Sequence, residues 1–154
     1  MTGWLSEDDA RNAAPHVQSA MLAVAPTLAA EPTADSSTNG AVFWHVSGMA
    51  HASPPEHARL TSVPMDPSLL GGWLDALNAA QSELQAVSGL CALTMAMCEM
   101  DGSAGAVCVL ETYESASACE AASSVLKTIA GASAPDGLVT GAVDAKAGPV
   151  HKSA

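Results

Sequence analysis

The segment LCALTMAMCEMDGSAGAVCVLETY, residues 90–113, decides how the rest of the chain is interpreted. Two runs rich in Val, Leu, Met, Cys and Thr, residues 90–100 and 106–113, flank the glycine-containing stretch 101–105. Such a pattern is typical of a β-hairpin. A half-exposed antiparallel strand alternates apolar and polar side chains, and neither run does so. We therefore expect both faces of the hairpin to be covered, one by helices and the other by a second sheet.

A helix is expected on each side of the hairpin in the sequence. Asp66 and Pro67 begin the first, because an Asp oxygen caps a free N–H and proline fits the first turn; Gly89 ends it. Ser115 caps the second helix, and Gly131 ends it. The expected buried stripes are Leu70, Trp73, Leu77, Ala80, Leu84 and Val87 in the first helix and Cys119, Ala122, Val125, Leu126 and Ile129 in the second.

Two further strands complete the pattern, one at residues 57–65 and one at residues 137–146. The order is then strand, helix, strand, strand, helix, strand, which is the split βαβ or ferredoxin-like arrangement. We predict an α+β fold in which residues 53–154 form a ferredoxin-like βαββαβ unit.

The beginning of the chain resembles its end. Aligning Trp4 with Tyr113 pairs Ser6 with Ser115, and Gly-Ala-Val occurs both at residues 40–42 and at residues 141–143. The identities are few, so a chance match is the alternative. We predict that residues 1–52 form an arm, a helix followed by a strand at residues 41–46, like half of a second repeat. Such an arm must dock on the sheet, add a strand to its edge, or swap onto a partner, because it cannot bury its own apolar face.

Family resemblance rests on Glu111-Thr-Tyr-Glu-Ser-Ala-Ser-Ala-Cys-Glu-Ala121, where an acid and an aromatic residue precede a serine and an alanine-rich helix. Residues 4–10 repeat this junction, and Pro-His-Val-Gln follows at residues 15–18. These motifs resemble the antibiotic biosynthesis monooxygenase (ABM) domains of the dimeric α+β barrel group. The resemblance covers most of the chain and implies the ferredoxin-like fold of that group.

The resemblance also implies two possible roles. Enzymes of the family oxygenate aromatic polyketide-like phenols with molecular oxygen and no metal or flavin, in a pocket between sheet and helices; other members degrade haem or have no demonstrated catalysis. Many members carry a histidine in the helix where this chain has Ala122, and Ala13 in the arm. The missing imidazole favours a non-catalytic accessory or assembly subunit of a larger complex. The alternative is a cofactor-independent monooxygenase-like enzyme acting on a small apolar aromatic substrate.

Four residues are candidates for the polar groups of an active site: Trp44 and His45 in the apolar strand, Tyr113 at a strand end, and His16 at the helix break. Each also has a structural explanation. A histidine in a strand is often satisfied by its neighbours, a tryptophan often packs, and the Tyr113 hydroxyl is expected to face water.

Metal and cofactor sites have little support. His45, His51 and His57 lie six residues apart and would share one face of a regular strand, but glycine and proline residues interrupt it. No glycine-rich phosphate loop lies between a strand and a helix. The four cysteines lack CxxC spacing, which favours packing over a zinc site and leaves a redox role as the alternative. We expect no metal and no cofactor.

Composition excludes several partners. The 154 residues carry 5 basic and 16 acidic side chains, a formal net charge of −11, which disfavours nucleic acid. No apolar run approaches the roughly 20 residues of a membrane span. No secretory signal precedes the fold, so we expect an intracellular or organellar protein. Expected partners are another protein or a second copy, bound through the sheet face and the arm, and a small apolar ligand. A pocket of roughly 300 Å³ or more containing His45 or Tyr113 would favour the enzyme, and an exposed apolar patch the subunit.

Overall fold

A computed structural model describes residue 11 and residues 40–52, 54–100 and 103–150. The chain divides into two units, residues 1–37 and residues 38–154. In the first unit only Arg11 is described, as an exposed helical residue. The helix expected near the N-terminus and the candidate His16 therefore lie outside the described residues.

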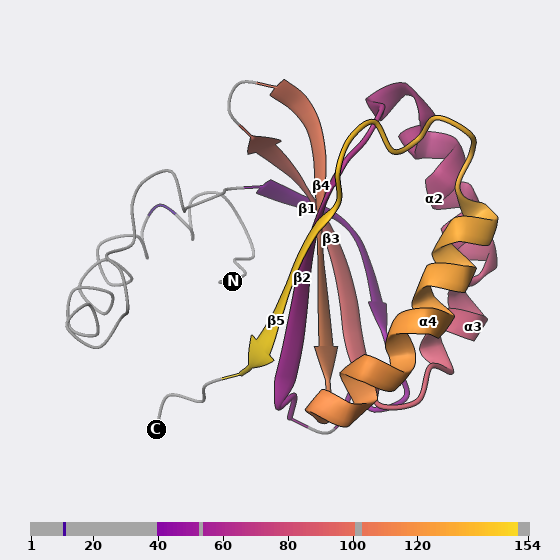
Figure 1. Cartoon of the computed structure of the whole chain (residues 1–154). Coiled ribbons are helices and arrows are strands. Elements are labelled where there is room, and N and C mark those ends of the chain that lie inside the picture. The colour runs from indigo at the N-terminus through magenta and orange to yellow at the C-terminus, as the bar shows by residue number, and fades with distance from the viewer. Residues whose placement is uncertain (1–10, 12–39, 53, 101–102, 151–154) are drawn as a thin grey trace. The chain divides into compact units, whose positions relative to one another are not determined.

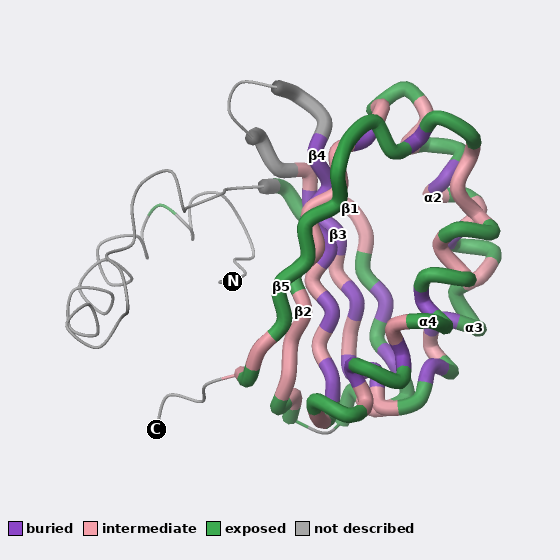
Figure 2. The backbone as a smooth tube through the Cα atoms, in the orientation of Figure 1, coloured by how far each residue is buried: buried purple, intermediate pink, exposed green. Residues whose placement is uncertain are grey.

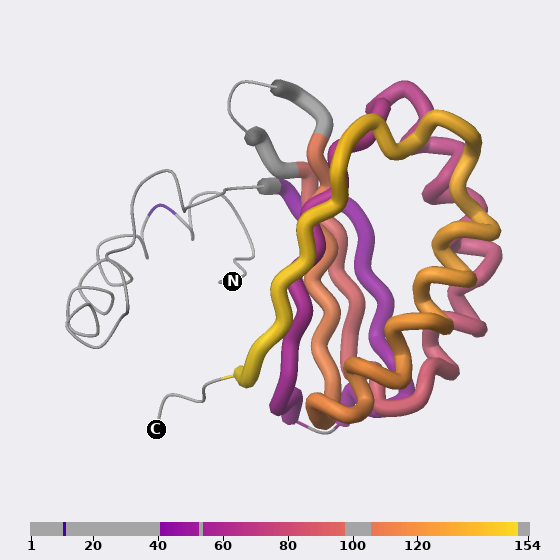
Figure 3. The backbone as a smooth tube through the Cα atoms, viewed as in Figure 1, coloured from indigo at the N-terminus to yellow at the C-terminus, as the bar shows by residue number. Residues whose placement is uncertain are grey.

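The second unit contains a five-stranded antiparallel sheet with the order β1-β3-β4-β2-β5 (Figures 1 and 3). Its last four strands, with the helices between them, follow the βαββαβ order and confirm the predicted ferredoxin-like α+β fold. The strands are β1 (Gly40–Ser47), β2 (His57–Pro64), β3 (Leu90–Met100), β4 (Ser103–Tyr113) and β5 (Asp144–Pro149).

The edge strand β1 confirms the strand expected at residues 41–46 and pairs with β3 of the ferredoxin-like unit. An extra residue at Phe43 forms a bulge between Val42 and Trp44. The division of the chain into an arm of residues 1–52 and a domain of residues 53–154 stays a prediction.

Helices begin where their capping residues predict. The Asp66 carboxylate accepts a hydrogen bond from the Ser68 backbone N–H at 2.9 Å, and Ser115 Oγ accepts from the Ala118 N–H at 3.1 Å. Gly89 has φ +72°, the left-handed conformation expected of it. The helical elements are η3 (Pro67–Leu69), α2 (Leu70–Ala79), α3 (Gln81–Gln85) and α4 (Ala116–Ser133).

Four details of the prediction were wrong. The first helix breaks at Ala80, whose ψ of 6° lies outside the helical region. Helix α4 continues through Gly131, which needs no positive φ there. Val125 is 47% exposed because the fully buried stripe of α4 is narrow and consists of Cys119, Ala122 and Leu126. The last strand begins at Asp144, since the preceding loop is held by a bond from the Thr140 N–H to Pro64 O and by the buried Leu138.

All described helices lie over one face of the sheet, which we call the inner face (Figure 1). Figure 2 shows burial concentrated in β3 and β4, whereas β5 is exposed along most of its length. The core between the inner face and the helices is built mainly from Val46, Met65, Trp73, Leu77, Leu84, Leu90, Leu93, Met95, Val107, Val109, Tyr113, Leu126 and Leu138.

The opposite, outer face carries Ala92, Thr94 and Ala96 of β3 and Cys108, Leu110 and Thr112 of β4, because side chains alternate along a strand. Leu60 is 41% and Val42 58% exposed there, and no described element covers this face. The second sheet expected over it is not among the described residues and stays a prediction. None of the described helices is long and apolar enough to cross a membrane.

Candidate functional site

A charged cluster lies inside the apolar layer between the sheet and α4. Arg59, at the centre of β2, lies opposite Glu111 of β4 and points to the inner face. Its Nε and Nη2 both lie 2.5 Å from Glu111 Oε2. Nη1 donates to Ser123 Oγ of α4 at 2.7 Å, so the arginine joins two strands to the helix.

Tyr113 completes this cluster. Its hydroxyl donates to Glu111 Oε2 at 2.7 Å and accepts from Arg59 Nη2 at 3.1 Å. The Arg59 guanidinium also lies 5.9 Å from the centre of the Tyr113 ring, within cation–π range. Tyr113 is 0% exposed. The expectation that its hydroxyl faces water was wrong, because the hydroxyl donates its hydrogen bond to the carboxylate of Glu111, two residues earlier in the strand. We call Arg59, Glu111, Tyr113 and Ser123 the arginine cluster.

Strand alternation explains why these groups meet. Val107, Val109, Glu111 and Tyr113 share one parity in β4, and the first two are buried core residues. The same parity carries Glu111 into the layer below α4, where it is 7% exposed. A carboxylate in that layer needs a partner, and Arg59 supplies it.

The environment fixes the protonation of two members. Burial lowers the pKa of Arg59, but the nearby Glu111 and Tyr113 outweigh this and the net pKa is raised. Burial, and then the charge of Glu111, raise the pKa of the Tyr113 hydroxyl. The cluster therefore holds a permanent cation beside a phenol that stays protonated, so Tyr113 can donate a hydrogen bond but cannot serve as a base at neutral pH.

Neighbouring α4 residues do not add a nucleophile. Cys119 is buried, and burial raises the pKa of its thiol more than Arg59 lowers it, so the thiol stays protonated. Ser123 accepts from Arg59, consistent with the absence of a base near it in the sequence. Ala122, which the family resemblance aligns with a histidine of many ABM members, is 3% exposed on the side of α4 that faces the sheet.

Trp44 and His45 lie on opposite faces of the sheet and do not join the arginine cluster. Trp44 packs against the core, and its Nε1 donates to Asn78 Oδ1 of α2 at 2.9 Å. His45 lies on the outer face, where its Nδ1 is 2.9 Å from Thr94 Oγ1. Both satisfy the structural explanations given for them from the sequence.

The three spaced histidines are not assembled into a site. His45 and His57 lie on β1 and β2, which β3 and β4 separate, and His51 Nδ1 lies 2.9 Å from Gly48 O. Within the described ranges no group of three His, Cys, Asp or Glu residues is placed to hold a metal ion.

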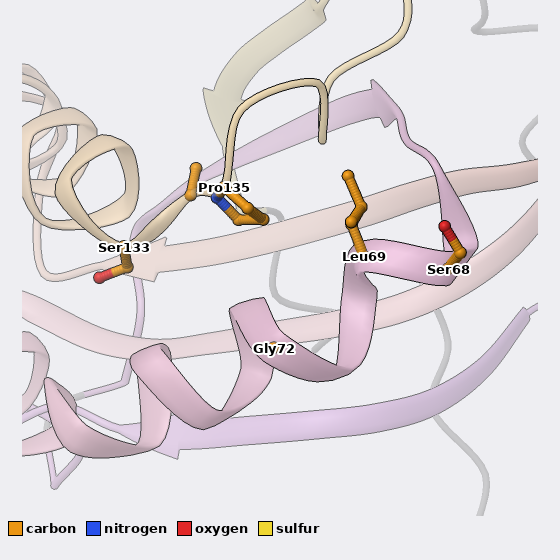
Figure 4. Close-up of a pocket in the computed structure, with 6 residues that line it drawn as sticks. Ser68, Leu69, Gly72, Ser133 and Pro135 are labelled. Atoms are coloured by element: carbon orange, nitrogen blue, oxygen red, sulfur yellow. The ribbon is translucent and has the colours of Figure 1, made fainter.

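A groove of about 380 Å³ lies elsewhere, between the start of α2 and the end of α4 (Figure 4). It has the size expected of a small-molecule site but contains neither His45 nor Tyr113. The groove is lined by Ser68, Leu69, Gly72, Ser133, Ala134 and Pro135.

Arg59 and Glu111 are the site residues that the sequence reasoning missed. Glu111 was noted only as part of the family junction, although its parity with Val107 and Val109 marks it as inward-facing. Arg59 is one of only 5 basic residues in the chain and stands within a predicted strand. A rare cation inside a strand was the sequence feature that could have identified it as a site residue.

Comparisons with known proteins bear on the fold. No protein-family model and no curated protein matches the chain. Among solved structures, an anthrone oxidase-like protein is 19% identical over 74% of this chain and 55% of its own, with a TM-score of 0.56. A Fusobacterium nucleatum protein, provisionally assigned as a monooxygenase, is 12% identical over 91% of this chain and 61% of its own, with a TM-score of 0.54. The chain has an ABM-like fold.

A third structure is a monooxygenase from the ActVA-Orf6 gene of Streptomyces coelicolor, in complex with nanaomycin D. It is 17% identical over 65% of this chain and 91% of its own, with a TM-score of 0.46. The ABM-like chain thus spans between about half and two thirds of the length of the first two structures.

Proposed function

We propose that this ABM-like protein is a cofactor-independent monooxygenase-like enzyme that acts on a small apolar aromatic phenol. The observation that carries the proposal is the arginine cluster. Replacing a buried ion pair by apolar residues is often neutral or stabilising, so stability alone does not account for one. Buried charged groups with perturbed pKa values also gather at functional sites.

The cluster suits the demands of such a reaction. A phenol and molecular oxygen give a quinone and water. The substrate loses one ring C–H hydrogen and the O–H hydrogen; one oxygen atom enters the ring, and the other leaves with the two hydrogens as water. The substrate itself is the reductant. Its electron-rich form is the phenolate, which the Arg59 cation would stabilise in an apolar layer. The Tyr113 hydroxyl, which donates to Glu111 in the structure, would have to turn from Glu111 to the substrate oxygen to add a second hydrogen bond. With no histidine at that helix position, the Arg59–Glu111 pair is the charged group that lies in the layer between the sheet and α4.

The test is oxygen uptake with anthrone and naphthol as probes, coupled to quinone absorbance. We expect turnover by the full chain and a large loss in Arg59→Gln, with unfolding curves recorded for both. His45→Ala is the matched control, because His45 lies on the outer face and should leave turnover unchanged. Absence of oxygen-dependent product from the folded wild-type chain, or equal losses in both variants, contradicts the proposal.

The outer face favours a second candidate, a non-catalytic assembly subunit that pairs with a second copy of this chain. Its centre is apolar, with Leu60 and Leu110, and its rim is polar, with His45 at one edge and Asp144 and Lys146 at the other. An apolar centre with a polar rim is the anatomy of an interface. A two-fold axis along the strands would set the His45 edge of one copy over the Asp144 edge of the other.

Light scattering of the full chain distinguishes this candidate. We expect a dimer that Leu60→Glu dissociates and that Val125→Glu, on the exposed side of α4, leaves intact. A monomeric wild-type chain, or equal dissociation by both variants, rejects pairing through the outer face.

A further inference from the structure

The arginine cluster holds a cation for a phenolate but has no group suited to take the proton of a phenol. Tyr113 and the neighbouring Cys119 both stay protonated, because burial raises the pKa of each. The Glu111 carboxylate is the partner of the Arg59 cation, and a proton on it would leave that cation unpaired. A reaction through a phenolate therefore needs a base from outside the cluster.

His57 lies beside the cluster on the inner face of the sheet. It precedes Arg59 by two positions in β2, and side chains two positions apart in a strand share a face. The strand register also sets His57 directly opposite Tyr113, as it sets Arg59 opposite Glu111. Residues paired in this way across antiparallel strands have Cβ atoms about 5 Å apart. The imidazole is therefore placed next to Tyr113 and on the same face as the Arg59 guanidinium.

The ring of His57 is available to accept a proton. Among the described residues, no hydrogen bond or ion pair uses its side chain, which is half-buried. The other described histidines differ. His45 Nδ1 lies 2.9 Å from Thr94 Oγ1. His51 Nδ1 lies 2.9 Å from Gly48 O. Histidine takes up and releases protons near neutral pH, and a half-buried ring can exchange them with water.

Arg59 has one N–H hydrogen left for a ligand. A guanidinium carries five such hydrogens. Nε and Nη2 both contact Glu111, Nη2 also donates to Tyr113, and Nη1 donates to Ser123. These contacts use four hydrogens and leave the second Nη1 hydrogen without a partner among the described residues. A phenol oxygen bound there would accept a charge-assisted hydrogen bond.

The inner face beside Arg59 is open along β5. Ala147 of β5 lies directly opposite Arg59, and Ala145 lies two positions before it on the same face. Both alanines are exposed, and the Arg59 side chain itself keeps 14% of its surface exposed. Because the side chains at this edge are small, an aromatic ring can approach Arg59 and His57 from the β5 side.

We propose that His57 is the catalytic base of the proposed oxygenation and takes the hydroxyl proton of a phenol whose oxygen binds the second Nη1 hydrogen of Arg59. In this step the phenol O–H bond breaks, its electron pair stays on the oxygen, and the proton forms an N–H bond with the neutral imidazole. His57 then gives the proton to the water that forms when oxygen is reduced. The assignment rests on the proposed function, because it supplies the phenolate that reacts there.

Binding of 1-naphthol in the absence of oxygen tests the proton transfer apart from turnover. Free 1-naphthol is neutral at pH 7, and naphtholate absorbs at longer wavelength. We expect a naphtholate band with the full wild-type chain, a roughly tenfold weaker band with His57→Gln, and an unchanged band with the matched control His45→Gln on the outer face. Imidazole added to His57→Ala should restore the band. Unfolding curves establish that each variant is folded.

The assignment of His57 is overturned if the wild-type chain gives no naphtholate band, or if His57→Gln gives the same band as the wild type. Oxygen uptake with the same naphthol separates this assignment from the proposed function. We expect His57→Gln to lower kcat about a hundredfold with little change in KM, as for the loss of a general base. A naphtholate band without oxygen uptake rejects the proposed function and keeps the base. Full oxygen uptake by His57→Gln rejects the base and keeps the function.

Discussion

Tyr113 donates its hydroxyl hydrogen to Glu111 Oε2 at 2.7 Å, although the two residues lie on the same strand and only two positions apart. Arg59 stands across from them on β2 and contacts both. An inward acid, an inward phenol and one cation thus form a closed unit. Its members should affect stability, titration and turnover together.

The titration of Tyr113 tests its burial directly, because it is the only tyrosine in the chain. Burial and the charge of Glu111 raise its pKa above the ordinary value of about 10. Stability from the neutral phenol is present below pH 10 and is lost as pH rises, because the unfolded chain ionises first. Above pH 10, the difference in unfolding free energy between wild type and Tyr113→Phe should therefore shrink by about 1.4 kcal/mol per pH unit. Tyrosinate absorbance at alkaline pH in the still-folded chain contradicts this.

Removing one partner of the Arg59–Glu111 ion pair should lower the unfolding free energy more than replacing both partners. Arg59→Met leaves the Glu111 carboxylate buried without a cation, and we expect a loss of about 3 kcal/mol in unfolding free energy. The double variant Arg59→Met/Glu111→Leu should regain most of it. Urea unfolding provides the measurement. A double variant that is less stable than Arg59→Met would show that the pair itself stabilises the fold.

Gly48 is required by the close approach of two strands. It is buried after β1, its N–H donates to Cys91 O at 3.0 Å, and a Cβ there would overlap the Leu90 carbonyl. Gly48→Ala should lower the unfolding free energy by about 3 kcal/mol, since backbone must move. Gly148→Ala, whose Cβ meets nothing within 4 Å, is the control. Equal stability of the two variants would disprove the requirement.

The Asp66 cap should show in the acid limb of stability. The Ser68 hydroxyl, and then its backbone N–H, lower the pKa of the Asp66 carboxyl. The contribution of the carboxylate is present above the ordinary value of about 3.9 and is lost as pH falls through the lowered pKa. Asp66→Asn should therefore reduce the loss of stability on acidification. Thermal melts from pH 5 to pH 2 measure it, and parallel curves for both proteins contradict it.

The fold could be predicted from the sequence because the features that indicate it depend on residues that are close together in the chain. The caps at Asp66 and Ser115, the left-handed Gly89 and the two apolar runs of the hairpin all depend on a few neighbouring residues. The start of β5 depends on tertiary contacts, such as the hydrogen bond from the Thr140 N–H to Pro64 O. Those contacts join residues far apart in the chain.

The candidate site was harder to predict for the same reason. Arg59 and Glu111 are 52 positions apart, and only the register of β2 with β4 sets them opposite one another. Tyr113 was recognised as a candidate, but its environment was not, because a tyrosine at a strand end gives no indication of an arginine on the next strand. Trp73 was recognised only as a member of an apolar stripe, which does not reveal that its indole N–H has no hydrogen-bond partner among the described residues.

The most direct test of the central claim, that the arginine cluster is a reaction site, is the rate of oxygen-dependent quinone formation in Tyr113→Phe at neutral pH. This variant removes one hydroxyl and keeps the ring. We predict a loss of about a hundredfold in turnover, as for other donors to a developing anion, with the chain still folded. Turnover equal to that of the wild type in a folded Tyr113→Phe chain would contradict the account.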